Sequence, residues 1–104
     1  MRPPTIIAPT GDLDMYTAAD LRPKLEAIAT DPSARLVVDL SDTDFIDSTG
    51  LGSIVQVWKR LARQGRTMAI VAPRGTAAAV LLEMSGLGRM LPVYETRDDA
   101  LDAA

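Results

Sequence analysis

The stretch from Phe45 to Gly52, which reads Phe-Ile-Asp-Ser-Thr-Gly-Leu-Gly, holds the residues of this chain best suited to chemistry. It follows an apolar run and opens a segment of helical periodicity, so its polar residues fall at a predicted helix start. The first backbone N–H groups of a helix lack internal partners, and the helix dipole is positive there. The chemistry that this stretch could support is therefore anion binding at a helix N-terminus.

Two interpretations of Asp47, Ser48 and Thr49 are open. Each is a common N-cap type, so a well-capped helix with no further role would explain one of them. It would not explain three in a row followed by Gly50 and Gly52. Glycine costs about 1 kcal/mol relative to alanine inside a helix, so two glycines in a first turn indicate that something approaches the backbone closely.

Composition limits the class of protein. The 104 residues, 47% apolar and 24% charged, predict one globular domain over residues 1–104. The net charge of −3 disfavours a nucleic-acid surface. No run approaches the roughly 18 apolar residues of a membrane span, and the N-terminus shows no signal-peptide pattern, so we expect a cytoplasmic protein.

The chain contains neither Cys nor His, which removes disulfides, Cys–His and Ser–His nucleophiles and the common zinc ligand sets. Asp42, Asp44 and Asp47 could suggest a hard-metal site, but alternating loop acids are more typical of turns. No base accompanies Ser48 in the sequence, so we interpret this serine as a substrate and expect no enzyme activity, cofactor or metal.

Apolar periodicity predicts four strand–helix pairs. The strands are predicted at residues 5–8, 35–40, 67–72 and 90–94. The helices are predicted from residue 16 or 17 to about 30, from 48 to about 63, from 76 to about 84, and after residue 96. This alternation predicts an α/β fold with a mixed, mainly parallel sheet of four to five strands and about four helices. Ligands of such sheets bind beyond the carboxyl ends of the strands, where Ser48 follows the strand at 35–40.

Some side-chain positions can also be predicted. Thr17 and Asp20 resemble a capping box at the start of the first helix. In the second helix, we expect Ser53 on the solvent side with the charged residues, and Val57 partly exposed. In the third helix, Val80, Leu81 and Met84 are expected to face inward.

Three short segments match a known family in order and spacing. They are residues 10–14, Thr-Gly-Asp-Leu-Asp; residues 45–52; and residues 84–87, Met-Ser-Gly-Leu. From about residue 5 to 101 the sequence resembles the STAS domain family, and within it the bacterial anti-sigma factor antagonists. The family usually begins with an extra strand, but only residues 1–4, with two prolines, precede the first predicted strand. That extra strand is expected to be short or missing.

The resemblance implies a partner switch. The unphosphorylated protein binds an anti-sigma factor that is itself a serine kinase, and a sigma factor is freed. Phosphorylation at Ser48 ends the binding, and a phosphatase resets the protein. Apart from the resemblance, we expect a monomer or weak homodimer, and the net charge and the lack of an apolar span predict no direct contact with nucleic acid or membrane. The partner-binding residues implied by the family pattern are Asp12, Asp14, Asp47, Thr49, Gly50, Leu51 and Gly52.

Other interpretations stay open. The chain could be a STAS scaffold or ligand-sensing module that is never phosphorylated. A receiver-like domain phosphorylated on Asp39, which ends a central apolar strand, is a more remote alternative. The sequence lacks the lysine that a receiver places after its last strand, since no Lys lies beyond Lys59.

Overall fold

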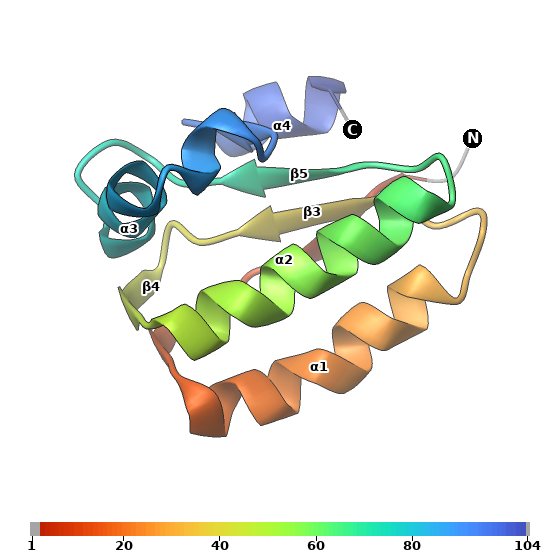
Figure 1. Cartoon of the computed structure of the whole chain (residues 1–104). Helices are drawn as coiled ribbons and strands as arrows, with labels where there is room; N and C mark the ends of the chain where they lie inside the picture. Colours follow the sequence, from red (N-terminus) through yellow and green to blue (C-terminus); the bar gives the residue numbers. More distant parts are fainter. Residues whose placement is uncertain (1–2, 104) are drawn as a thin grey trace.

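A sheet of four strands forms the centre of the molecule (Figure 1). The computed structural model describes residues 3–103. The order across the sheet is β1 (Thr5–Ile7), β3 (Leu36–Asp39), β5 (Met68–Val71) and β6 (Val93–Tyr94). All pairings of this sheet within residues 3–103 are parallel, as the alternation of strands and helices predicts.

Helices cover both faces of the sheet. On one face lie α1 (Met15–Ala29) and α2 (Ser48–Arg63), which run side by side (Figure 1). The third helix, α3 (Ala77–Ser85), continues through a short 3-10 turn, η1 (Leu87–Arg89). The last helix, α4 (Arg97–Ala103), packs on the opposite face against β3, β5 and β6.

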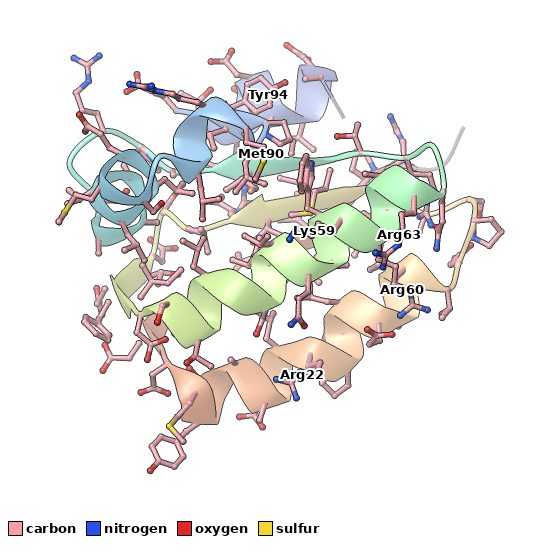
Figure 2. The ribbon with its side chains drawn as sticks, viewed as in Figure 1. Arg22, Lys59, Arg60, Arg63, Met90 and Tyr94 are labelled. Atoms are coloured by element: carbon pink, nitrogen blue, oxygen red, sulfur yellow. The ribbon has the colours of Figure 1, made fainter. Side chains whose placement is uncertain are left out.

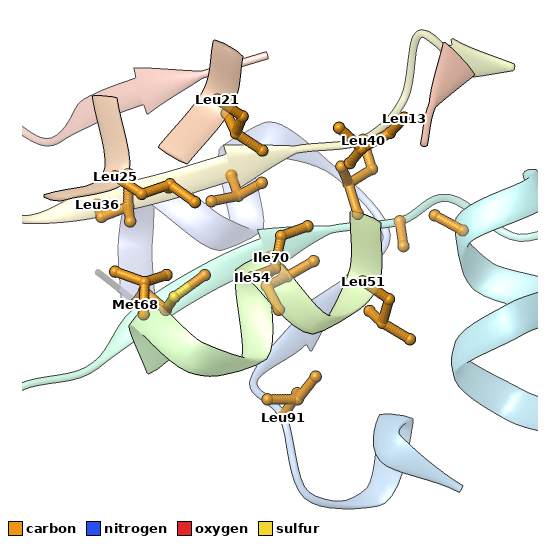
Figure 3. Close-up of a cluster of buried hydrophobic side chains, with 14 of the residues drawn as sticks. Leu13, Leu21, Leu25, Leu36, Leu40, Leu51, Ile54, Met68, Ile70 and Leu91 are labelled. Atoms are coloured by element: carbon orange, nitrogen blue, oxygen red, sulfur yellow. The ribbon is translucent and has the colours of Figure 1, made fainter. Parts of the chain in front are cut away.

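The core is aliphatic, as the shortage of aromatic residues predicts. All four residues of β3 and of β5 are buried, which is typical of parallel strands covered on both faces. Figure 3 shows Ile54 of α2 beside Ile70 of β5, and neither side chain is exposed. Burying each such side chain contributes about 1.5–3 kcal/mol, so this layer fixes α2 on the sheet.

A second sheet of two strands was not predicted from the sequence. It pairs β2 (Gly11–Leu13) with β4 (Thr43–Ile46) in parallel, where the sequence indicated a turn and a polar loop. The Thr43 hydroxyl also donates to the Pro9 carbonyl at 3.0 Å. Both strands are very short and contain Gly or Asp, which disfavour strands locally, so only the pairing of distant segments makes them strands.

The first helix was predicted to start at residue 16 or 17, but α1 starts at Met15, one or two positions earlier. Asp14 is the N-cap, and its carboxylate accepts from the amides of Tyr16 and Thr17. The Thr17 hydroxyl accepts from the Asp14 amide at 2.9 Å, which completes the capping box. The predicted box of Thr17 with Asp20 is wrong. The hydrogen bond from the Thr17 N–H, aided by that from Tyr16, lowers the pKa of Asp14.

Several predicted side-chain positions are also wrong. Val57 and Ser53 are buried, because the outer side of α2 packs against α1. Val80 and Met84 are exposed, since α3 buries Ala78 and Leu82 instead.

At the N-terminal end, the first described strand is β1, an edge strand that pairs with β3 alone within residues 3–103. Pro3 and Pro4 form no strand, and the rest of the predicted short or missing strand lies outside the described residues. Within residues 3–103 no helix is long and apolar enough to cross a membrane.

An ion pair between the half-exposed Arg97 and the buried Asp39 holds α4 to the sheet. Arg97, the first residue of α4, donates to the Asp39 carboxylate at 2.8 Å. Burial raises the pKa of Asp39, but hydrogen bonds from the Ser41 hydroxyl and amide and from Arg97 outweigh it and leave the pKa lowered. The ionised carboxylate is therefore favoured in the folded state, and its contribution to stability is present above the ordinary pKa of 3.8.

We expect Arg97→Ala to lower the free energy of unfolding by about 1 kcal/mol at pH 7, because it leaves the buried Asp39 carboxylate with fewer donors. As the pH falls below 3.8, Asp39 becomes protonated and the difference from the wild type should shrink. Urea unfolding at a series of pH values measures both effects. Arg74→Ala is the matched control, because it breaks the exposed Arg74–Glu95 pair and should change stability by less than about 0.5 kcal/mol. Equal losses from the two variants would contradict the structural role of Asp39.

Candidate functional site

The candidate site is built around the start of α2. Asp47 is the N-cap in an extended conformation, and its carboxylate accepts from the Gly50 amide at 2.8 Å. Its carbonyl accepts from the Leu51 amide at 3.0 Å, the first hydrogen bond of the helix. The capping interpretation of Asp47 is therefore confirmed, and its carboxylate is committed to the helix.

Ser48 is the first residue of α2 and is exposed. Its hydroxyl makes no hydrogen bond to another residue of the described chain, in contrast to Ser53, which donates to the Thr49 carbonyl at 3.2 Å. Thr49 is also exposed. With Asp47 acting as the cap, the hydroxyls of Ser48 and Thr49 are not needed to begin the helix.

The two glycines of this stretch have different surroundings. A Cβ atom on Gly50 would lie 2.4 Å from the Leu13 carbonyl oxygen, so the helix start can approach β2 only with glycine at this position. A Cβ atom on Gly52 would meet nothing within 4 Å. The sequence indicated close approach at both positions. At Gly50 the approaching group is the chain itself, while the space beside Gly52 is open to another molecule.

The pairing of β2 with β4 brings two of the sequence motifs together. Asp12 stands opposite Phe45, and Leu13 stands opposite Ile46. The Asp47 amide donates to the Leu13 carbonyl at 3.2 Å, which continues this contact into the helix start. Residues 10–14 and 45–52 therefore form one rim of the molecule, although a whole helix separates them in the sequence.

Carboxylates make this rim acidic. Asp12 is exposed, and its side chain has no hydrogen-bond partner in the described chain, so it is free to meet a cation of another protein. Asp14 caps α1, as described above. Asp44 is exposed on β4. The predicted acidic residues are thus brought together by the fold, although Asp14 and Asp47 also have local structural roles.

The third motif, residues 84–87, also lies near the start of α2, on the side of that helix away from residues 10–14. Gly86 ends α3 in the left-handed conformation, with φ of 76°. Ser85, the last residue of α3, and Leu87, which follows Gly86, line a groove between α2 and α3, which Ser48 and Gly52 also line. The groove has a volume of about 380 Å³ and mostly apolar walls. Leu51, a predicted partner contact, is 4% exposed and contributes to its floor.

Sequence reasoning missed several exposed apolar side chains near this rim. Phe45 on β4 is 52% exposed, and α3, which packs against β4, exposes Met84 at 80%. Met15 and Tyr16 are exposed on the first turn of α1. Aromatic residues and Met are enriched in protein interfaces. No local pattern identifies Phe45, because it stands beside the buried and equally apolar Ile46 in the sequence.

Other candidate positions do not form a site. Asp39 is 5% exposed, and Ser41 and Arg97 hold its oxygens, so the receiver-like interpretation gains no accessible acceptor. No group of three or more His, Cys, Asp or Glu side chains within residues 3–103 is arranged to hold a metal ion.

The fold agrees with comparisons to known proteins. The family model for the STAS domain matches residues 2–100, and the chain belongs to this family. An anti-sigma F factor antagonist of Paenibacillus polymyxa is 34% identical over 97 residues, which cover 92% of this chain and 82% of that protein. The anti-sigma-F factor antagonist RsfB of Mycobacterium tuberculosis is 30% identical over 91 residues, covering 88% of this chain and 73% of RsfB.

A solved structure gives the same result. The crystal structure of an anti-sigma factor antagonist from Mycobacterium paratuberculosis superimposes with a TM-score of 0.88 and is 31% identical. The match covers 99% of this chain and 86% of that chain. The STAS resemblance and the α/β fold expected from the sequence are therefore confirmed.

The two glycines should respond oppositely to alanine. Gly50→Ala forces a Cβ atom against the Leu13 carbonyl and should lower the free energy of unfolding by about 1–3 kcal/mol. Gly52→Ala meets open space and should raise it by about 0.5–1 kcal/mol, because alanine is the better helix former. Urea unfolding of both variants tests this. A stable Gly50→Ala protein would show that the contact between α2 and β2 is loose.

Proposed function

We propose that this protein is an anti-sigma factor antagonist that works by partner switching. In its unphosphorylated form it binds an anti-sigma factor that is a serine kinase, and this frees a sigma factor. The observation that carries the proposal is the convergence of all three family motifs around the exposed start of α2. Relatives named as anti-sigma factor antagonists, at 30–34% identity over most of the chain, support the same role.

We assign phosphorylation to Ser48. Its hydroxyl is exposed and free of internal hydrogen bonds, so a kinase can reach it without unfolding the helix. No general base among the described residues hydrogen-bonds to it, which supports a substrate rather than a nucleophile. The open space beside Gly52, one turn further along α2, lets a kinase backbone come close. Thr49 is the neighbouring candidate and is disfavoured only by its place in the family motif.

The physical effect of the phosphate falls on the interface rather than on the fold. A phosphoserine carries a charge of about −1.5 to −2 at pH 7. At the start of α2 the helix dipole favours such a charge by about 0.3–1 kcal/mol, so the folded state should tolerate it. The rim already carries Asp12, Asp14 and Asp44. The partner group that packs against the neutral Ser48 hydroxyl would meet a phosphate instead, and a like charge facing that phosphate across the interface costs several kcal/mol.

The binding surface that we propose is larger than the motif. It combines the acidic residues with the exposed Phe45 and with Met84 of α3, so that apolar contacts supply affinity and the carboxylates supply specificity. The partner-binding assignments of Asp12, Asp14, Asp47, Thr49, Gly50, Leu51 and Gly52 remain proposals. Of these, Gly50 and Leu51 would act mainly by holding the rim in place, because both are buried.

A STAS scaffold that is never phosphorylated is the second candidate. It shares the fold and the rim but requires no access to Ser48. Incubation with candidate anti-sigma kinases separates the two functions, because a scaffold would bind without gaining mass when ATP is added.

We expect the wild-type protein to be phosphorylated on Ser48 by its cognate kinase, and the phosphorylated form to bind that kinase about a hundredfold more weakly, which corresponds to about 3 kcal/mol. Mass spectrometry with peptide mapping measures the modification, and calorimetry measures the affinity. Ser48→Ala should bind with nearly unchanged affinity and gain no phosphate, while the matched control Thr49→Ala should still be phosphorylated. Phosphate that persists on Ser48→Ala and disappears from Thr49→Ala would move the site to Thr49.

Phe45→Ala should weaken kinase binding about tenfold or more, because it removes an exposed aromatic anchor beside the helix start. The loss of stability should stay below about 1 kcal/mol, since half of this side chain is already in solvent. Met90→Ala is the control, because Met90 is 50% exposed but follows η1 and is no part of the proposed surface. Equal binding by the wild type and Phe45→Ala would remove Phe45 from the interface.

A further inference from the structure

A groove of about 290 Å³ lies between α1 and α2, and cationic side chains dominate it. Among the described residues that line it, Glu26 is the one carboxylate. The groove is therefore locally cationic, although the whole chain has a net charge of −3. Figure 2 shows the cationic side chains projecting from the two helices. They are Arg22 of α1 and Lys59, Arg60 and Arg63 of α2.

The needs of the fold account for only part of this cluster. Arg60 forms an ion pair with Glu26 and ties the two helices together. Arg60 and Arg63 lie in the last turn of α2, where they complement the helix dipole. Neither reason applies to Arg22, which lies in the middle of α1, or to Lys59, which precedes the last turn. Within residues 3–103, the side chains of Arg22, Lys59 and Arg63 form no ion pair.

The lining of the groove indicates what could bind there. Between the cations lie the buried apolar side chains Leu25 and Val57 and the exposed amide of Gln56. The lining spans Ser53 to Arg63 along α2, roughly 15 Å at the rise of a helix, so the positive charges are spread out rather than focused on one point. A small anion would reach few of these cations and none of the apolar surface.

We propose that this groove is a second docking surface, which binds an acidic segment of a partner protein. Carboxylates of that segment pair with Arg22, Lys59 and Arg63, and its apolar side chains lie against the aliphatic stems of these same residues. An acidic, extended segment with apolar side chains would match this groove in charge and in shape, because the groove is cationic, elongated and apolar at its base. Nucleic acid is disfavoured because the net charge of the chain and the acidic rim repel a long polyanion.

This surface borders the groove at the start of α2, because Gln56 and Lys59 line both. Its cations on α2 nevertheless lie away from Ser48: Lys59 is roughly 16 Å and Arg63 roughly 22 Å further along α2 at the rise of a helix. We therefore expect the groove to bind its partner whether or not Ser48 is phosphorylated.

The test uses an amphipathic peptide with Glu on one side and Leu on the other, and the same peptide with Gln in place of Glu as the control ligand. Titration into the whole protein, followed by NMR of the backbone amides, should shift residues of α1 and α2 along the groove for the Glu peptide alone. The triple variant Arg22→Gln, Lys59→Gln and Arg63→Gln should bind about tenfold more weakly, since three exposed ion pairs are lost together. The ion pair of Arg60 with Glu26 is left intact, so the variant should remain folded.

The matched control is the triple variant Lys24→Gln, Arg74→Gln and Arg89→Gln, which removes the same charge outside the groove. It should bind like the wild type. Equal weakening of both variants, or equal binding of the Glu and Gln peptides, would overturn the proposal. The proposal would also be overturned if inorganic phosphate or a DNA duplex, and not the peptide, shifted the amides of the groove. Self-association of the wild type that is lost in the first triple variant would overturn it as well. Ser48→Ala should leave peptide binding unchanged, so this result is independent of the phosphorylation test.

Discussion

The contact between the start of α2 and the backbone of β2 is the constraint on which the rest of the site depends. The Leu13 carbonyl accepts from the Asp47 amide, and the same oxygen fills the space that a side chain on Gly50 would need. Because helix and strand meet backbone to backbone, the position of the helix start is set by main-chain atoms. Ser48 is consequently displayed on a rigid support, although it lies at the end of a loop.

This rigid support explains how a small chemical change could act as a switch. Phosphate at a helix N-terminus lies in a favourable local field, so it need not disturb the fold. Under the proposed switch, the energetic cost would appear only when a partner is present, because the charge would then lie in a desolvated interface. Binding, rather than folding, would then be the quantity that phosphorylation changes.

Charge is distributed unevenly along the layer formed by α1 and α2. Acidic residues gather at the amino ends of the two helices, and cationic residues gather towards the carboxyl end of α2. Part of this follows from capping and from the helix dipoles, which favour carboxylates at one end and cations at the other. Capping and helix dipoles do not explain the positions of Arg22 and Lys59. With these two residues, the face formed by α1 and α2 has a cationic surface as well as the acidic rim.

The sequence by itself determined the alternation of strands and helices, the bounds of α2 and the exposed setting of Ser48, because these follow from local periodicity and from capping chemistry. It could not determine β2 and β4, whose few residues become strands only when segments 30 residues apart pair. It also misplaced Val57, Val80 and Met84, because the direction that a helix faces depends on which neighbours cover it. Only the tertiary structure decided that Gly50 serves the fold while the space beside Gly52 stays open, since the two glycines are indistinguishable until the path of the Leu13 backbone is known.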